Sequence, residues 1–285
     1  MIDIQRYAGK QAHVNSYLLS DANGVIVVDL LRNSPEADRL ADYVQASGKK
    51  LETIFVTHGH PDHYLGLGVF HRRFPNAPVK VASSEIRDDI IGFSQWMESV
   101  GWLDAEPTMK PKFNKNRDGF DYAGIVQVLE TPFLQLSSEP TRIEVQCDYP
   151  GSECGHMTTL CIPEQLAFLG FDLLYNHVHA WCGTGVGKAE IENWIHSLDA
   201  IKKKTADGEW TFYCGHGSEG KREVLSNMKE YLQTFVKVTS EARSREEAIE
   251  KMKRSFPGFA EDDFLLVQSV NFHVTENTAS STRAS

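Results

Sequence analysis

The sequence lacks the long apolar runs that membrane-spanning helices need. Its apolar stretches, such as residues 24–28, are far shorter than the ~20 residues that cross a bilayer. The first seven residues also lack a basic stretch followed by an apolar one, which is the pattern of a secretory signal. We therefore expect a cytoplasmic protein that does not act at a membrane.

Basic side chains are also in the minority. There are 29 Lys and Arg residues against 39 Asp and Glu, which gives a formal net charge of −10. Such a chain lacks the broad basic surface that binds phosphate backbones, so no nucleic-acid partner is expected. The hydrophobic share of 41% and the length of 285 residues are typical of a globular protein with a sizeable core. We expect its partner to be a small-molecule substrate; a homodimer is compatible with the sequence.

Cysteine gives no sign of a disulfide framework or of a structural zinc knuckle. The count is five, which is odd, and no two cysteines are spaced as Cys-x-x-Cys. We interpret all five as free thiols, most of them buried.

Strand-like and helix-like patterns alternate along residues 1–271, which we interpret as one domain. Strands followed by helices occur twice, a pattern that suits two similar α/β halves packed sheet against sheet. The tail, residues 272–285, is polar and rich in small residues, so we predict that it is disordered. Strands are expected near residues 14–19, 25–30, 51–56, 79–82, 125–129, 142–147, 157–162, 165–171 and 210–214, and helices near 34–46, 64–74, 189–202, 221–238 and 245–255.

Residues 85–122 differ from the rest of the domain. They carry many aromatic side chains, including Trp96 and Trp102, interrupted by Pro, Lys and Asn. We interpret them as a helix followed by an irregular loop. Such an insert serves either as a lid over a binding site or as a local cluster packed on the core. As a lid, its aromatic side chains would favour a small-molecule substrate with an apolar acyl or ring group.

The strongest chemical signal is the segment Thr57-His-Gly-His-Pro-Asp-His63, which follows an apolar strand. Three imidazoles and a carboxylate lie within six residues, and both groups bind zinc, iron, manganese or cobalt. A strand end that continues into a loop lets such side chains converge on one point.

This segment resembles the His-x-His-x-Asp-His motif of the metallo-β-lactamase superfamily. Gly155-His156, Asp172 and Gly215-His216 follow in the order and strand-end contexts that the superfamily uses. The resemblance implies a four-layer αββα sandwich of two mixed β-sheets with helices on the outer faces. It also implies a centre for two divalent metal ions, in the first instance zinc, with iron, manganese or cobalt as alternatives.

The resemblance assigns ligands to both ions. It gives His58, His60 and His156 to one ion, Asp62, His63 and His216 to the other, and Asp172 as the bridge.

Two further residues resemble family residues that assist the metal centre. Asp29 resembles a carboxylate that orients a metal ligand without binding the ion, which is reasonable because a bound His usually donates its other N–H to an acceptor. Tyr175 resembles the tyrosine of lactonases that polarises the substrate carbonyl; the alternative is an aromatic ring packed on the sheet. With this tyrosine and the bridging Asp172, the chain looks more like the glyoxalase II, lactonase and thioesterase branches than like true β-lactamases.

Two more histidines follow Tyr175. In an extended loop His177 and His179 share one face with it, where they would line the substrate pocket; the alternative is that they are incidental loop residues.

The resemblance implies a hydrolase in which a hydroxide between two metal ions attacks the carbonyl of a lactone, ester, thioester or amide. Asp62 or water would supply the proton to the leaving group, so Asp62 and Tyr175 are the candidate catalytic residues. The main alternative is an oxidoreductase similar to sulfur dioxygenases, which use one iron. A nuclease or a binding protein with a vestigial site agrees less well with the acidic charge and the full ligand set.

Overall fold

A computed structural model describes residues 1–112, 119–260 and 263–275 of the chain. The first half forms a six-stranded sheet in the order β1-β2-β3-β4-β5-β6. Strand β2 runs antiparallel to both of its neighbours, β1 and β3, and β3 to β6 run parallel to one another. The strands are β1 (Asp3–Ala8), β2 (Asn15–Ser20), β3 (Gly24–Val28), β4 (Lys50–Phe55), β5 (Val79–Val81) and β6 (Val126–Val128).

The second half forms a five-stranded sheet in the order β11-β10-β9-β8-β7. Only β10 and β11 are parallel, so this sheet is also mixed. Its strands are β7 (Phe133–Leu134), β8 (Ile143–Gln146), β9 (Thr159–Ile162), β10 (Ala167–Asn176) and β11 (Thr211–Gly217).

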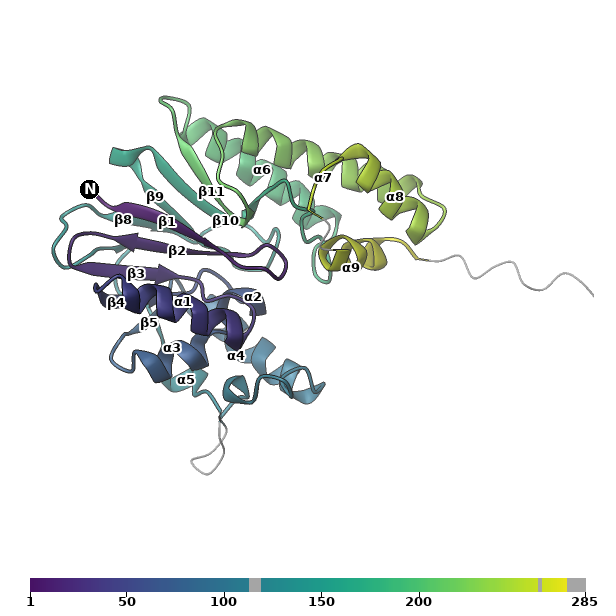
Figure 1. The fold of residues 1–285 in the computed structure, drawn as a ribbon. Coiled ribbons are helices and arrows are strands. Elements are labelled where there is room, and N and C mark those ends of the chain that lie inside the picture. The colour runs from purple at the N-terminus through teal and green to yellow at the C-terminus, as the bar shows by residue number, and fades with distance from the viewer. Residues whose placement is uncertain (113–118, 261–262, 276–285) are drawn as a thin grey trace, which may run out of the picture.

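Helices cover the outer face of each sheet, so the molecule has four layers (Figure 1). The first sheet is covered by α1 (Ser34–Ala46), α3 (Leu67–Arg73) and α4 (Ser84–Ser99), and the second by α6 (Lys188–Lys204) and α7 (Glu223–Glu241). One apolar cluster, which includes Tyr17, Phe55 and Phe171, lies between the sheets. The predicted αββα sandwich is confirmed.

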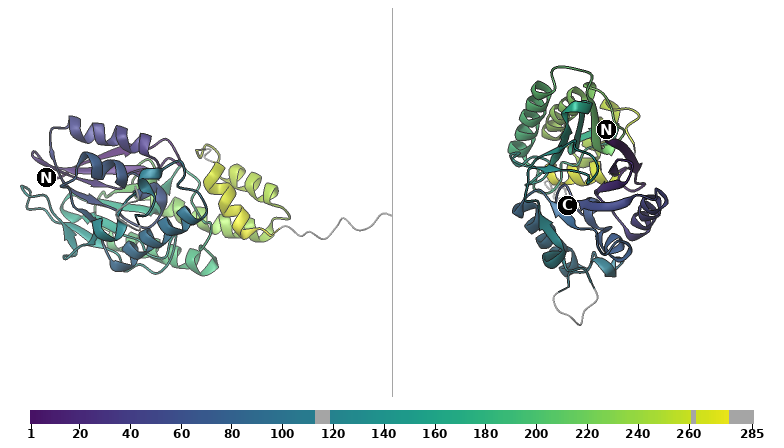
Figure 2. Two further views of the ribbon diagram at one scale, coloured as in Figure 1. Left: turned by 90° about the horizontal axis from the view of Figure 1, so that it is seen from below. Right: turned by 90° about the vertical axis from the view of Figure 1, so that its left-hand side faces the viewer.

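The remaining helices are short or lie near the C-terminus. They are α2 (Pro61–Tyr64), α5 (Tyr122–Ile125), α8 (Arg245–Ser255) and α9 (Asp263–His273). Figure 2 shows that α8 and α9 extend beyond one end of the two sheets. Within the described ranges, no helix is both long and apolar enough to cross a membrane.

Local sequence explains where the long helices begin. The Asn33 side chain accepts a hydrogen bond from Glu36 N and caps α1, whose first turn contains a proline. Ser83 caps α4 in the same way through Ile86 N. In α1, Leu40, Ala41 and Val44 make up much of the buried face that packs on the sheet.

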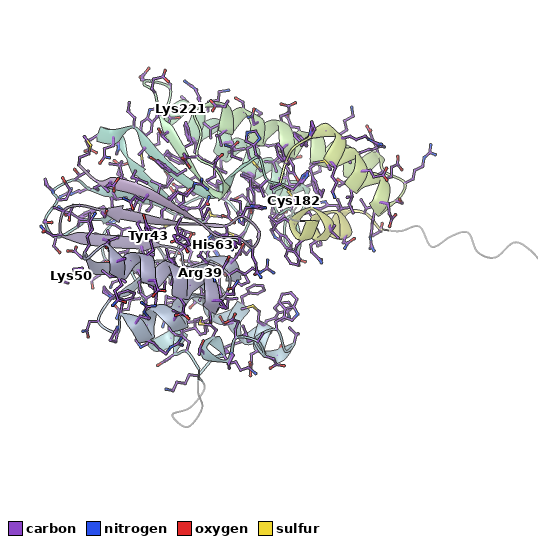
Figure 3. All side chains as sticks on the ribbon, in the orientation of Figure 1. Arg39, Tyr43, Lys50, His63, Cys182 and Lys221 are labelled. Atoms are coloured by element: carbon purple, nitrogen blue, oxygen red, sulfur yellow. The ribbon has the colours of Figure 1, made fainter. Side chains whose placement is uncertain are left out.

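Several sequence expectations need adjustment. Strand β1 and helix α9 were not predicted. Helix α9 includes Phe272 and His273, so the predicted tail begins too early; its residues 276–285 lie outside the described part, as do residues 113–118 of the predicted insert. All five cysteines are free, and Cys161, Cys182 and Cys214 are buried. Figure 3 shows Cys182 beside α9, where its backbone N–H donates to Ser269 Oγ at 2.7 Å.

Candidate metal centre

The histidine-rich loop follows β4 and continues into α2. His58 and His63 are fully buried, whereas 24% of the His60 side chain and 16% of the Asp62 side chain are exposed. A proline in the first turn of α2 starts this short helix directly after His60. Two of the predicted ligands therefore lie in the loop and two in the helix.

A buried carboxylate fixes this loop. Asp29 follows β3 with a left-handed backbone, at φ 61°. Its Oδ1 accepts from Thr57 N, and its Oδ2 accepts from Thr57 Oγ1, both at 2.9 Å; His63 Nδ1 lies 2.8 Å from the same Oδ2. Burial raises the pKa of Asp29. Through His63 Nδ1, Asp29 orients the ring so that Nε2 faces the centre of the site, which is the geometry expected for a carboxylate that orients a ligand.

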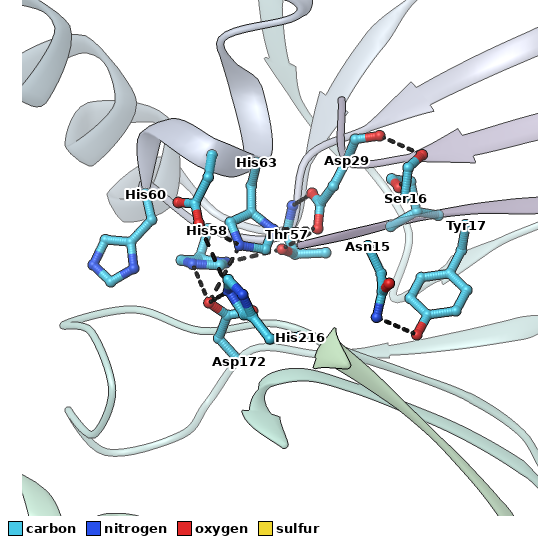
Figure 4. A network of polar contacts seen from close by, with 12 residues as sticks. Asn15, Ser16, Tyr17, Asp29, Thr57, His58, His60, His63, Asp172 and His216 are labelled. Carbon is cyan, nitrogen blue, oxygen red and sulfur yellow. Dashed lines mark hydrogen bonds and ion pairs between the residues drawn. The ribbon is translucent and has the colours of Figure 1, made fainter. Parts of the chain in front are cut away.

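Asp172 lies at the centre of three imidazoles. Its Oδ2 is 3.2 Å from His63 Nε2, 3.2 Å from His216 Nε2 and 3.6 Å from His58 Nε2 (Figure 4). Burial opposes the charge, but the imidazoles outweigh it and hold the pKa of Asp172 well below its usual range. Asp172 is thus placed as a bridging carboxylate would be.

Neighbouring strands bring Asp172 and His216 together. β10 and β11 are parallel, and their pairing shifts register between Leu169 and Phe171 and again between Phe171 and Tyr175, the interval that contains Asp172. His216 Nδ1 lies 2.6 Å from the carbonyl oxygen of Ala12, so the ring presents Nε2 to Asp172. The prediction ended the first of these strands at residue 171, but the strand continues to Asn176.

The structure does not bring His156 to this cluster. Its Nδ1 lies 2.7 Å from Asp89 Oδ2 on α4, and 44% of its side chain is exposed. Glu153 lies beside His58 and His60 instead, fully buried. Sequence reasoning missed Glu153 because no periodic pattern marks a glutamate in the irregular loop between β8 and β9.

Two sets of side chains have the geometry of ligands for an ion. In each set, atoms that could ligate lie within 4.8 Å of one another: His58, His60, Glu153 and Asp172 in the first, and Asp62, His63 and His216 in the second. Buried atoms in both sets have no hydrogen-bond partner: His58 Nε2, His63 Nε2, Glu153 Oε2 and Asp172 Oδ1. Unpartnered buried polar atoms are costly, and bound cations would satisfy them. Imidazole and carboxylate are also suitable donors, so the residues fit the metal ions that were predicted.

Tyr175 contacts residues of both ligand sets. Its hydroxyl lies 3.1 Å from Asp172 Oδ2 and 3.2 Å from Glu153 Oε1, and its ring stacks on His216 with centroids 4.5 Å apart. Burial, followed by Asp172 and Glu153, raises its pKa well above the usual value. Tyr175 therefore stays protonated at neutral pH and can act as a hydrogen-bond donor.

Neither of the two further histidines belongs to the two ligand sets. His177 has a left-handed backbone at φ 56°, is exposed and contacts the Phe259 ring. With Tyr175 it lines a cavity of about 200 Å³ beside α7. His179 is buried, and its Nδ1 lies 3.2 Å from Tyr231 Oη. The rings of His177 and His179 both contact the Phe259 ring, although the left-handed residue 177 interrupts the strand alternation.

Comparisons with known proteins agree with the fold described above. Residues 9–130 match the family model of the metallo-beta-lactamase superfamily. A metallo-beta-lactamase from Pontibacter korlensis has a TM-score of 0.54 at 15% identity and covers 82% of this chain and 99% of that one. The DIM-1 metallo-beta-lactamase has a TM-score of 0.53 at 13% identity and covers 82% of this chain and 93% of that one.

Curated relatives match a shorter segment. The hydroxyacylglutathione hydrolase 1 of Vibrio vulnificus is 34% identical over 65 residues, which are 23% of this chain and 25% of the relative. The hydroxyacylglutathione hydrolase of Francisella philomiragia is 38% identical over 63 residues, 22% of this chain and 23% of the relative. The matched segment thus spans about a quarter of these relatives. The family model therefore covers less than half of the chain, and the solved structures show that the chain shares the fold of metallo-beta-lactamases.

Proposed function

We propose that this chain is a metal-dependent hydrolase that attacks the carbonyl of an ester, lactone or thioester at a centre for two divalent ions. The observation that carries the proposal is the position of Asp172, whose carboxylate faces ligand-type side chains of both sets. Similarity to hydroxyacylglutathione hydrolases supports an acyl substrate. Zinc is the first choice of metal, with iron, manganese and cobalt as alternatives.

Bound ions would lower the pKa of water toward neutrality and polarise the substrate carbonyl. The protein contributes orientation and proton handling. Asp29 and the Ala12 carbonyl fix the rings of His63 and His216. Tyr175 offers its hydroxyl to the carbonyl oxygen, where negative charge develops during attack. Asp62, partly exposed and 3.6 Å from His216 Nε2, can pass a proton from solvent to the leaving group.

The cavity beside Tyr175 suits an apolar acyl or ring group. Its walls include Tyr231, Phe256 and Phe259, with His177 at the exposed side. Tyr175 lines this cavity and its hydroxyl lies 3.1 Å from Asp172 Oδ2, so we expect a substrate held there to place its carbonyl near the proposed ions. His177 is then a substrate-binding residue, and His179 supports the cavity through Tyr231.

Metal analysis combined with a substrate panel tests the proposal. Protein purified without added metal should contain two divalent ions per chain and hydrolyse at least one lactone, thioester or aryl ester. Asp172→Ala should lose activity. One iron per chain, no hydrolysis, and oxygen uptake with a persulfide would contradict the proposal and favour the dioxygenase alternative.

The substrate cavity has a separate test. Phe259→Ala removes an aromatic wall and should raise KM for substrates with long acyl groups, with little effect on short ones. Trp96→Ala and Trp102→Ala are the matched comparison, because these exposed aromatic residues belong to the insert at residues 85–122. A larger KM for the tryptophan variants than for Phe259→Ala would instead assign substrate binding to the insert.

A further inference from the structure

The side chain of Glu153 is buried at the first ligand set with one oxygen unpartnered. Its Oε1 lies 3.2 Å from His60 Nδ1 and accepts from Tyr175 Oη, also at 3.2 Å. Its Oε2 lies 4.0 Å from His58 Nε2 and has no hydrogen-bond partner. Burying a carboxylate in this way is unfavourable unless a cation compensates its charge.

The loop turns Glu153 inward and His156 outward. Ser152 N donates to the carbonyl of Cys154 at 2.9 Å, and Cys154 Sγ donates to the carbonyl of His156 at 3.1 Å. These contacts close a tight turn between the two residues. His156 consequently pairs with Asp89, whose side chain is 41% exposed, at the protein surface.

We infer that Glu153, and not His156, is the third ligand of the ion held by His58 and His60. Two ligands about 2.1 Å from one ion lie roughly 3–4 Å apart at the usual coordination angles. The distances from Glu153 to His58 and His60 fall in this range. His156 makes no such contact.

Glu153 makes the two metal positions chemically alike. Each has two imidazoles and one carboxylate of its own, and both share Asp172. A histidine as the third ligand would have given the first metal position one more nitrogen donor and one negative charge fewer. Oxygen donors bind manganese and iron(II) better than imidazole donors do. With Glu153 as a ligand, the ratio of zinc affinity to manganese affinity at this position should therefore be smaller than with a third histidine.

Two amide variants separate the candidate ligands. Metal-free wild type, Glu153→Gln and His156→Gln are titrated with Zn²⁺ and with Mn²⁺ by calorimetry, and bound metal is measured after dialysis. Wild type and His156→Gln should bind two ions. Glu153→Gln should bind one, or bind the second more than ~100-fold more weakly, because loss of a direct ligand exceeds the 10–100-fold effect of losing a residue that only orients one.

Either of two results overturns the inference: Glu153→Gln keeps both ions at wild-type affinity, or His156→Gln loses one. Circular dichroism checks the fold. If Glu153→Gln does not fold, His156→Gln alone decides, since loss of an ion there refutes the inference and retention of both supports it. Glu153→His is a further comparison, and it should raise the ratio of zinc to manganese affinity about tenfold.

The inference rests on the metal centre of the proposed function, but the two fail differently. A wild-type protein that binds no divalent ion contradicts the proposed function. A wild type that binds two ions, with Glu153→Gln unchanged, contradicts only the role of Glu153.

Discussion

Gly215 packs so closely against Asp172 that no side chain fits at this position. A Cβ atom on residue 215 would lie 1.8 Å from Asp172 Oδ1, 2.7 Å from the carbonyl carbon of Phe171 and 2.8 Å from Asp172 N. Real Cβ atoms essentially never come within 3.0 Å of such atoms. In Gly215→Ala the carboxylate must therefore move by about 1.2 Å, and the backbones of β10 and β11 must separate.

The displacement is large on the scale of catalytic geometry. A misplacement of ~1 Å typically costs about 10²-fold in rate, because reacting groups leave their aligned positions. Asp172 also serves both ligand sets, so we expect weaker binding of both ions. Forcing extra atoms into a packed interior costs ~1–3 kcal/mol of unfolding free energy.

The measurements are hydrolysis rate, bound metal and thermal unfolding of Gly215→Ala. Gly92→Ala is the matched control, because Gly92 lies in α4 with no atom within 4 Å of its added Cβ. That control should keep full activity. Its free energy of unfolding should rise by up to about 1 kcal/mol, since alanine favours a helix more than glycine does. Wild-type metal content and activity in Gly215→Ala would refute the bridging role that we give to Asp172.

Three more predictions concern side chains around the ions. Asp29→Asn should weaken the ion held by His63 by ~10–100-fold, measured by metal titration, because the ring loses its charged hydrogen-bond acceptor; an unchanged affinity would contradict that role. Tyr175→Phe should lower kcat by ~10²–10³-fold while two ions remain bound, and an unaltered kcat would mean that the hydroxyl does not meet the reacting carbonyl. Burial opposes the charge on His60, but Glu153 raises its pKa to about 9, so at pH 7 the metal-free protein holds a proton that must leave on ligation. Metal affinity should thus rise from pH 7 toward pH 9, with proton release visible by calorimetry in buffers of different ionisation enthalpy; affinity independent of pH would refute this assignment.

The fold was largely predictable because its strands and helices have clear periodic patterns. Strands β2 and β3 are continuous runs of buried residues, and α1 has both a cap and an apolar face. Strand β1 was missed because its side chains are mostly exposed and give no apolar run. Helix α9 was missed because its apolar residues show no helical period.

The predicted ligands that the structure gathers into one cluster are close in the sequence or lie on regular strands. His58, His60, Asp62 and His63 are close in the sequence, so a strand end and one helical turn are enough to gather them. Asp172 and His216 lie on the neighbouring strands β10 and β11, which the pattern of the second half identified.

By itself the sequence indicated the two-sheet architecture and most of the side chains that the structure gathers as candidate ligands, because hydrophobic periodicity and short-range spacing depend on local chemistry. Only the tertiary structure places Glu153, and not His156, beside His58 and His60, although the two lie three residues apart in one irregular loop. The choice depends on which direction the turn at Cys154 takes and on whether Asp89 of a distant helix captures the histidine. Such contacts join residues far apart in the chain, so no local pattern encodes them.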